Sequence, residues 1–140
     1  MPATHNFSDI FISYSRRNKP FVTKLEQALS QHPTISEVWV DWEDIPESVD
    51  WWAEIQAGIE GANTFLFILT PDSARSAVCT REIEHAVKSN KRIVPIIHID
   101  VTEADDQTKI HPAIQRHNWI PFREDDNFEE RVNDVIKVIG

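Results

Sequence analysis

Short apolar runs alternate with amphipathic stretches along this chain, and the alternation predicts its secondary structure. The runs at residues 9–13 (DIFIS) and 64–69 (TFLFIL) are continuous, as expected of strands that bury both faces in a parallel sheet. The second run is the most continuous in the sequence and stops at Thr70-Pro71, so it is the candidate central strand. Further strands are expected at 38–40, 92–98 and 118–122.

Apolar residues three and four positions apart predict helices between these strands. Asn18 is placed to cap the first helix, whose apolar face would hold Val22, Leu25 and Leu29. Pro95 marks the strand at 92–98 as edge-like or irregular. Further helices are expected at about 51–62, at 73–90 with a break, and from Phe128 to Ile139, whereas 101–117 is polar and receives no element.

This order of elements predicts an open, parallel α/β sheet with helices on both faces, because right-handed crossovers leave few other arrangements. Ligands of such sheets bind beyond the carboxyl ends of the strands, at the point where strand order reverses. The residues that leave the first strand, from Ser13 to Arg17, and the loop at 42–49 are therefore the places to look for function.

The helix expected at 51–62 places one carboxylate beside its buried stripe. At about 100° per residue, the stripe consists of Trp51, Ile55, Gly58, Ile59 and Ala62. Glu54 falls on the shoulder of this stripe, next to the small residues at 57, 58 and 61, which leave it uncovered. Asp50 is the expected N-cap of the helix, but Glu54 is not three residues beyond it and so does not complete a capping box. Glu54 is therefore either a functional carboxylate or a first-turn glutamate favoured by the helix dipole. Spacing alone does not decide between these two interpretations.

Composition limits the class of protein. A chain of 140 residues with 41% hydrophobic content suits one domain, with a core from about residue 8 to 139. The net charge of −9 opposes phosphate backbones and anionic membranes, so neither nucleic acid nor a membrane is an expected partner. One cysteine, no leader and no run of 18 apolar residues predict a cytoplasmic chain without disulfides or a membrane span.

Several kinds of site are absent from the sequence. Only three glycines are present, and two of them, Gly58 and Gly61, fall inside a predicted helix, so there is neither a GxGxxG fingerprint nor a P-loop. The six histidines lack helical metal-ligand spacing, and no metal site is expected. A receiver domain would need an aspartate at the end of the third strand, where this chain has Leu69-Thr70.

Five segments together resemble the TIR (Toll/interleukin-1 receptor) domain family. They are DIFISYS at 9–15, VWVDWED at 38–44, WWAEIQAGIEGANTFLFILTP at 51–71, CTREI at 79–83 and RIVPII at 92–97. The resemblance implies a flavodoxin-like, three-layer α/β/α fold with a five-stranded parallel sheet in the order 2-1-3-4-5. It also implies that residues 1–140 form a single TIR domain taken from a larger, multidomain protein.

Members of this family divide in function, and the chain resembles the bacterial members that cleave NAD. The implied function is an NAD+ glycohydrolase of immune or defence signalling. It would release nicotinamide together with ADP-ribose or a cyclic isomer, with NAD+ as substrate and no cofactor. The alternative is a non-enzymatic TIR scaffold that signals by homotypic assembly. A nucleoside-processing transferase on a similar fold is the third possibility.

A single carboxylate is chemically sufficient for NAD cleavage. An ordinary glycoside needs a second carboxyl group to protonate the departing oxygen, whereas nicotinamide leaves as a neutral molecule. The remaining task is to stabilise a ribosyl cation, which a carboxylate performs electrostatically. The resemblance implies a catalytic glutamate in the helix after the loop at 42–49, which is Glu54 here, with Glu47 and Glu60 as fallback candidates.

The resemblance also implies a set of substrate-binding residues. Tyr14, Ser15 and Arg16 follow the first strand, and Arg16 is a natural partner for the pyrophosphate. Asp41, Trp42 and Trp51 would line the ribose and nicotinamide side, and Cys79 would border the site. For Trp51 and Cys79 the competing interpretation is packing in the hydrophobic core.

Self-association is the remaining expectation from the family. The loop at 42–49 carries apolar groups among acids, and TIR relatives assemble through this loop. Trp42, Ile45 and Pro46 are the residues expected to make that contact.

Overall fold

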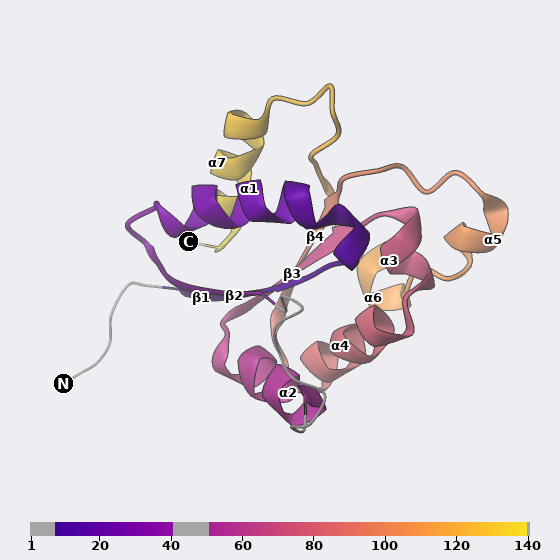
Figure 1. Ribbon diagram of the computed structural model, residues 1–140, viewed down its shortest axis with the longest axis horizontal. Helices are drawn as coiled ribbons and strands as arrows, with labels where there is room; N and C mark the ends of the chain where they lie inside the picture. Colours follow the sequence, from indigo (N-terminus) through magenta and orange to yellow (C-terminus); the bar gives the residue numbers. More distant parts are fainter. Residues whose placement is uncertain (1–7, 41–50, 140) are drawn as a thin grey trace.

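The computed structural model describes residues 8–40 and 51–139, which form five strands and the helices that cover them (Figure 1). In chain order the elements are β1 (Ser8–Ser13), the 3-10 helix η1 (Arg16–Asn18), α1 (Lys19–Ser30), β2 (Ile35–Val40), α2 (Trp51–Gly61), β3 (Thr64–Leu69), α3 (Pro71–Arg75), α4 (Ala77–Lys88), β4 (Arg92–Ile97), α5 (Ala104–Gln107), α6 (Pro112–Gln115), β5 (Ile120–Pro121) and α7 (Phe128–Ile139).

The strands form one parallel sheet in the order β2-β1-β3-β4-β5. This confirms the predicted fold class and strand order. The chain crosses from β1 to its neighbour β2 and then to β3 on the other side of β1, so strand order reverses at β1 and β3. Ser13, the last residue of β1, lies opposite Phe67 of β3 at this switch point.

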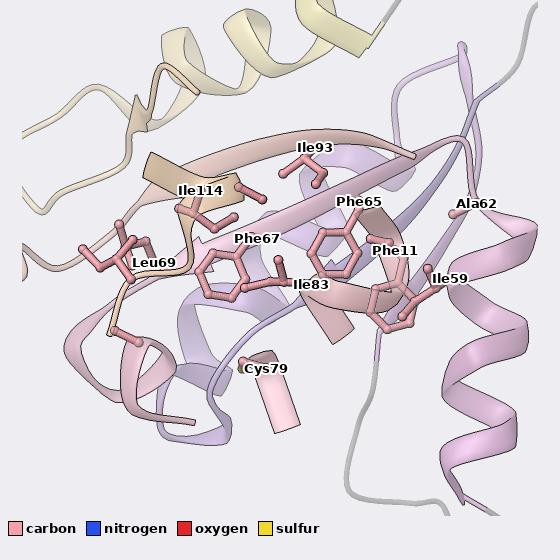
Figure 2. Close-up of a cluster of buried hydrophobic side chains, with 14 of the residues drawn as sticks. Phe11, Ile59, Ala62, Phe65, Phe67, Leu69, Cys79, Ile83, Ile93 and Ile114 are labelled. Carbon is pink, nitrogen blue, oxygen red and sulfur yellow. The ribbon is translucent and has the colours of Figure 1, made fainter. Parts of the chain in front are cut away.

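Helices cover the sheet on both faces, with α1 and α7 on one side and α2 and α4 on the other (Figure 1). Alternation along β1 divides the core accordingly, because successive side chains of a strand point to opposite faces. Ile10, Ile12 and Tyr14 belong to the cluster beneath α1 and α7. Phe11 belongs to the cluster on the side of α2 and α4, which Figure 2 shows around Phe65 and Phe67.

One local prediction needs correction. Asn18 is at the N-cap position of α1, but its side chain makes no capping bond. Its Oδ1 instead accepts a hydrogen bond from the hydroxyl of Thr70 (3.0 Å), which ties the turn after β1 to the end of β3.

The edge-like character predicted at Pro95 is confirmed. β4 pairs with β3 along its whole length, but β5 pairs only with Ile96 and Ile97, so residues 92–95 have a strand on one side only.

The broken helix predicted at 73–90 is two helices, α3 and α4, separated at Ser76. The backbone of Ser76 is extended (φ −78°, ψ 121°), and its hydroxyl accepts a hydrogen bond from the N–H of Cys79 (3.1 Å). Ser76 therefore ends one helix and caps the next. This cap fixes the rotation of α4, which buries Cys79, Ile83 and Ala86 against the sheet.

Helix α2 packs closely on the side chain of Trp39 in the edge strand β2. Trp39 of β2 stacks on Phe11 with 4.8 Å between ring centroids and 11° between ring planes. The indole thus lies flat beneath α2, where Gly58 faces it. A Cβ atom at Gly58 would lie 2.9 Å from the Trp39 ring and 3.3 Å from Phe11. Glycine is required here because the ring leaves no room for a methyl group.

We therefore expect Gly58→Ala to lower the free energy of unfolding by about 1 to 3 kcal/mol, the usual cost of overpacking a filled core. Gly61→Ala in the same helix is the matched control, since a Cβ there meets nothing within 4 Å. It should be neutral or stabilising by up to about 1 kcal/mol, because alanine is the better helix former. Urea denaturation of both variants measures the difference, and equal stabilities would contradict the close packing.

Candidate active site

A carboxylate is buried at the switch point of the sheet, although the sequence analysis did not select it. Glu82 of α4 is 2% exposed, and Ser13 at the end of β1 is 0% exposed. The Ser13 hydroxyl donates a hydrogen bond to Glu82 Oε1 at 2.6 Å. This short distance is typical of a hydroxyl bound to a carboxylate. The two residues join α4 to β1 where ligands of this type of sheet bind.

Helix α4 places Glu82 on its buried side through the rotation set at Ser76. At about 100° per residue, Glu82 falls in the same arc as Cys79 and Ala86. Its neighbours in that arc pack in the hydrophobic cluster of Phe67, Leu69 and Ile83, where Figure 2 labels Cys79 and Ile83. Glutamate is rarely this buried without a partner. A charged residue within an otherwise apolar helical stripe therefore indicates a buried polar site, and position 82 shows this pattern in the sequence alone.

Aromatic and cationic side chains from α2 and α4 meet beside this site. The Arg81 guanidinium lies over the Trp52 ring at 4.0 Å from its centroid and 5.9 Å from that of Trp51. Trp51 and Trp52 are half-buried and pack against the same core cluster. Trp51 thus contacts the core, as its competing interpretation held, while its helix remains next to the helix that carries Glu82.

The predicted substrate-binding residues after β1 do not gather around Glu82. Tyr14 is 6% exposed and belongs to the cluster beneath α1 and α7, so it lies on the opposite face from Ser13. The Ser15 hydroxyl accepts a bond from the Arg17 N–H (3.4 Å) and caps η1. Arg16 is exposed on that turn. Cys79 is buried on α4, in the core beside Glu82.

Glu54 lies in the first turn of α2, where the helical pattern placed it. It is exposed and lines a groove of about 230 Å³ together with Glu37, Trp39 and the small residues of α2. Asp9 of β1 and Gly61, at the other end of α2, also line this groove. The predicted role of Glu54 as the catalytic residue stays a prediction.

The other predicted site residues lie elsewhere or outside the described part of the chain. Glu60 Oε2 is 2.8 Å from His85 Nε2 on the outer surface of α2 and α4. The remaining predicted residues lie outside the described part of the chain; they are Asp41, Trp42, Ile45, Pro46, Glu47 and the expected cap Asp50.

Two kinds of site are absent from the described residues. In residues 8–40 and 51–139, no three His, Cys, Asp or Glu side chains are grouped as metal ligands would be. None of the helices in these ranges has the length and apolar character that crossing a bilayer requires.

Sequence comparison establishes the family. The family model described as TIR domain matches residues 10–136, which is most of the chain. The protein therefore belongs to the TIR domain family. No curated protein gives a significant match.

Solved structures of low sequence identity share the fold. The TIR domains of the activated Roq1 resistosome, which directly recognises the pathogen effector XopQ, are 16% identical, with a TM-score of 0.69 over 95% of this chain and 99% of theirs. A heterodimer of the RPS4 and RRS1 TIR domains is 18% identical, with a TM-score of 0.63 over 94% of each chain. A CMP N-glycosidase of Clostridium botulinum, BcmB, is 16% identical, with a TM-score of 0.56 over 91% of this chain and 98% of its own. The RPS4 and RRS1 TIR domains thus assemble with each other.

The buried pair of Ser13 and Glu82 makes a prediction about stability. Ser13→Ala removes the donor to a buried carboxylate, so we expect the free energy of unfolding to fall by about 1.5 to 3 kcal/mol. Ser30→Ala is the matched control, because the Ser30 hydroxyl donates to Glu26 at 2.7 Å but is exposed. It should change stability by less than about 0.5 kcal/mol. Urea titrations that gave both variants the same small effect would contradict a buried, charge-assisted bond.

Proposed function

We propose that this TIR domain is an NAD+ glycohydrolase that acts in the cytoplasm in immune or defence signalling, with Glu82 as its first candidate for the catalytic carboxylate. The observation that carries the proposal is the buried carboxylate of Glu82, held by Ser13 at the carboxyl end of β1. Membership of the TIR family supports the choice of NAD+ as substrate.

The reaction requires little of the protein beyond electrostatics. The bond between the nicotinamide nitrogen and the ribose carbon breaks, and its electron pair remains on nicotinamide, which becomes neutral. The ribose then carries positive charge, which a fixed carboxylate in a site of low dielectric stabilises more strongly than one in water. Water or a nucleophile within the substrate captures the cation, and this step decides between ADP-ribose and a cyclic isomer.

Burial and fixation favour Glu82 over Glu54. Glu54 is exposed, so water screens its charge, and the groove it lines holds the further acid Glu37. Glu82 is fixed by a hydrogen bond before any substrate arrives, which is the preorganisation that electrostatic catalysis requires. Glu54 remains the second candidate, because the family resemblance first pointed to the helix that carries it.

The pyrophosphate of the dinucleotide is anionic, and the protein itself carries a net charge of −9. Binding therefore requires a positively charged side chain close to the pyrophosphate. Arg16 on the turn after β1 is the proposed partner of the pyrophosphate, because a guanidinium binds phosphate through two parallel hydrogen bonds. Trp51, at the start of α2, is the proposed aromatic contact for the ribose and nicotinamide side. Cys79, one turn before Glu82 on α4, would border the reacting end.

Two other functions are alternatives to NAD+ cleavage, and one experiment distinguishes the three. The similarity to BcmB favours an N-glycosidase that acts on a nucleotide such as CMP. The TIR heterodimer favours a scaffold that acts only by assembling. Incubating the domain with NAD+ and, separately, with CMP distinguishes all three by the release of nicotinamide, of cytosine or of neither.

Glu82→Gln keeps the shape of the side chain and its acceptor for Ser13 while it removes the charge. Losing one preorganised electrostatic contact costs about 3 to 4 kcal/mol, so we expect kcat for nicotinamide release to fall by roughly two to three decades. KM and the melting temperature should change little. Chromatographic measurement of nicotinamide from NAD+ gives the rates.

Glu54→Gln is the comparison variant, made in the same background and assayed beside Glu82→Gln. We expect it to retain activity within about threefold of the parent, since an exposed first-turn glutamate contributes only about 0.3 to 1 kcal/mol through the helix dipole. The reverse result, an inactive Glu54→Gln and an active Glu82→Gln, would transfer the catalytic role to Glu54. Activity in both variants would remove both residues from the mechanism.

A further inference from the structure

One cationic side chain of α4 rests on aromatic rings and not on a carboxylate. Arg81 is exposed, and its guanidinium lies 4.0 Å from the centroid of the Trp52 ring and 5.9 Å from that of Trp51. Among the described residues it forms no ion pair and no side-chain hydrogen bond. Glu84 is three residues further along α4, where an ion pair with Arg81 is possible, but Glu84 Oε2 lies 3.7 Å from His111 Nε2 instead. Cation–π attraction therefore holds the guanidinium over the indole face.

The ring of Trp52 is fixed by its other contacts. Trp51 and His85 make T-shaped contacts with it, at 6.1 and 6.2 Å between ring centroids. Trp52 also packs against the core cluster on this side of the sheet, and His85 in turn lies 2.8 Å from Glu60. The indole face is thus a fixed surface. The Arg81 side chain over it is long and exposed, and one weak attraction holds it there.

This stack lies near the edge of the sheet at which Glu82 is buried. α2 and α4 each follow a strand of a parallel sheet, so both helices begin at its carboxyl edge. The two helices contact each other (Figure 1), and Trp52 is the second residue of α2. Arg81 directly precedes Glu82 and lies about 100° away around the axis of α4. From neighbouring positions, α4 therefore directs Glu82 toward β1 and Arg81 toward α2.

The cation over Trp52 has the same character as one end of the proposed substrate. In NAD+ the nicotinamide ring is a flat pyridinium cation, and an indole face attracts it for the same reason that it attracts a guanidinium. Cleavage leaves the electron pair on nicotinamide, so the product is neutral and loses this attraction. An indole face that binds cations therefore favours the substrate over its product.

We propose that Arg81 is a displaceable cation that sets the specificity of the site. It covers the Trp52 face in the free domain and releases that face to the nicotinamide ring of the substrate. After cleavage the guanidinium returns to the ring and displaces neutral nicotinamide. The proposal rests on the proposed function for its substrate, but it assigns Arg81 and Trp52 roles that NAD+ cleavage by Glu82 does not require. The class of ligand is a planar aromatic cation.

Removing the competing cation should tighten substrate binding. A site that its own side chain occupies for part of the time shows an affinity reduced by that fraction. Arg81→Gln should therefore lower KM for NAD+ by about three- to sixfold, the factor expected of one exposed cation–π contact. General electrostatics predicts the opposite sign, because NAD+ is an anion overall and the variant loses a positive charge. Arg116→Gln, the same change at an exposed position elsewhere, is the control and should not lower KM.

Two probes test the ring face without turnover. The 1-methylnicotinamide cation and neutral nicotinamide share one ring system and differ in charge, and calorimetric titration measures the Kd of each. The parental domain should bind the cation more tightly than nicotinamide. Arg81→Gln should tighten both, whereas the loss of a distant charge would not change the binding of neutral nicotinamide.

The same two probes test the role of Trp52. Trp52→Leu should remove the preference for the cation, because the aromatic face is lost. Trp52→Phe keeps a ring in the position and serves if the leucine variant does not fold. It should weaken the preference, because phenylalanine binds cations less strongly than tryptophan.

The inference and the proposed function fail in different ways. If Arg81→Gln releases nicotinamide with an unchanged or raised KM, the inference is overturned and the proposed function stands. A preference for the cation that persists in folded Trp52→Leu also overturns the inference, as does a parental domain that does not bind 1-methylnicotinamide. If the domain does not cleave NAD+ but binds both probes as expected, the proposed function fails, and Trp52 with Arg81 is a site for planar cations.

Discussion

Strand β3 has no face that water can reach, and the arrangement of the other elements follows from this. All six of its residues, from Thr64 to Leu69, are at most 2% exposed. A strand buried in this way needs a strand on each side and helices above and below. β1 and β4 supply the sides, and since β2 pairs with the far side of β1, the chain must reverse its strand order there. The constraint that buries β3 thus also sets the switch point at which Ser13 and Glu82 meet.

The fold does not need a carboxylate at position 82. A buried acid loses its hydration, and partners such as Ser13 must offset that loss. A leucine or methionine in the same arc of α4 would fill the space beside Cys79 without this cost. Residues that lower stability in this way are typical of functional sites, where chemistry and not packing decides the side chain. Glu82 therefore requires an explanation that the hydrophobic core does not give.

The sequence was most informative where one physical effect dominates. The run TFLFIL has a single interpretation, and the structure forms β3 over the predicted residues 64–69. The apolar face of the last helix was predicted equally well. Phe128, Val132 and Val135 lie on that face and pack in the core cluster between α7 and the sheet. In contrast, the start of β2 at Ile35 was missed, since ISEVWV mixes exposed and buried positions in an edge strand.

Tertiary contacts explain what the pattern could not predict. Asn18 has a residue type suited to capping, but Thr70 binds its side chain from 52 positions away. Glu54 and Glu82 have the same side chain, and local spacing favoured the one beside small residues. The difference between them is the partner Ser13, 69 positions from Glu82 and brought near by the sheet. A period of 3.6 residues identifies the buried face of α4. It does not identify which residues of the sheet contact that face.

The turn after β1 connects two charged residues that the hydrophobic core does not require, Glu82 through its partner Ser13 and Arg17 on η1. It begins at Ser13, which holds Glu82 on one face, and continues through η1, where Arg17 is exposed. The turn is fixed rather than loose, because the Ser15 carbonyl accepts a bond from the Asn18 N–H (2.8 Å) and Asn18 is bound by Thr70. A group that binds at this turn therefore orders little additional backbone, and the entropy lost on binding comes from the exposed side chain itself. The same rigidity places any contact at Arg17 only four residues from the donor that orients the buried carboxylate.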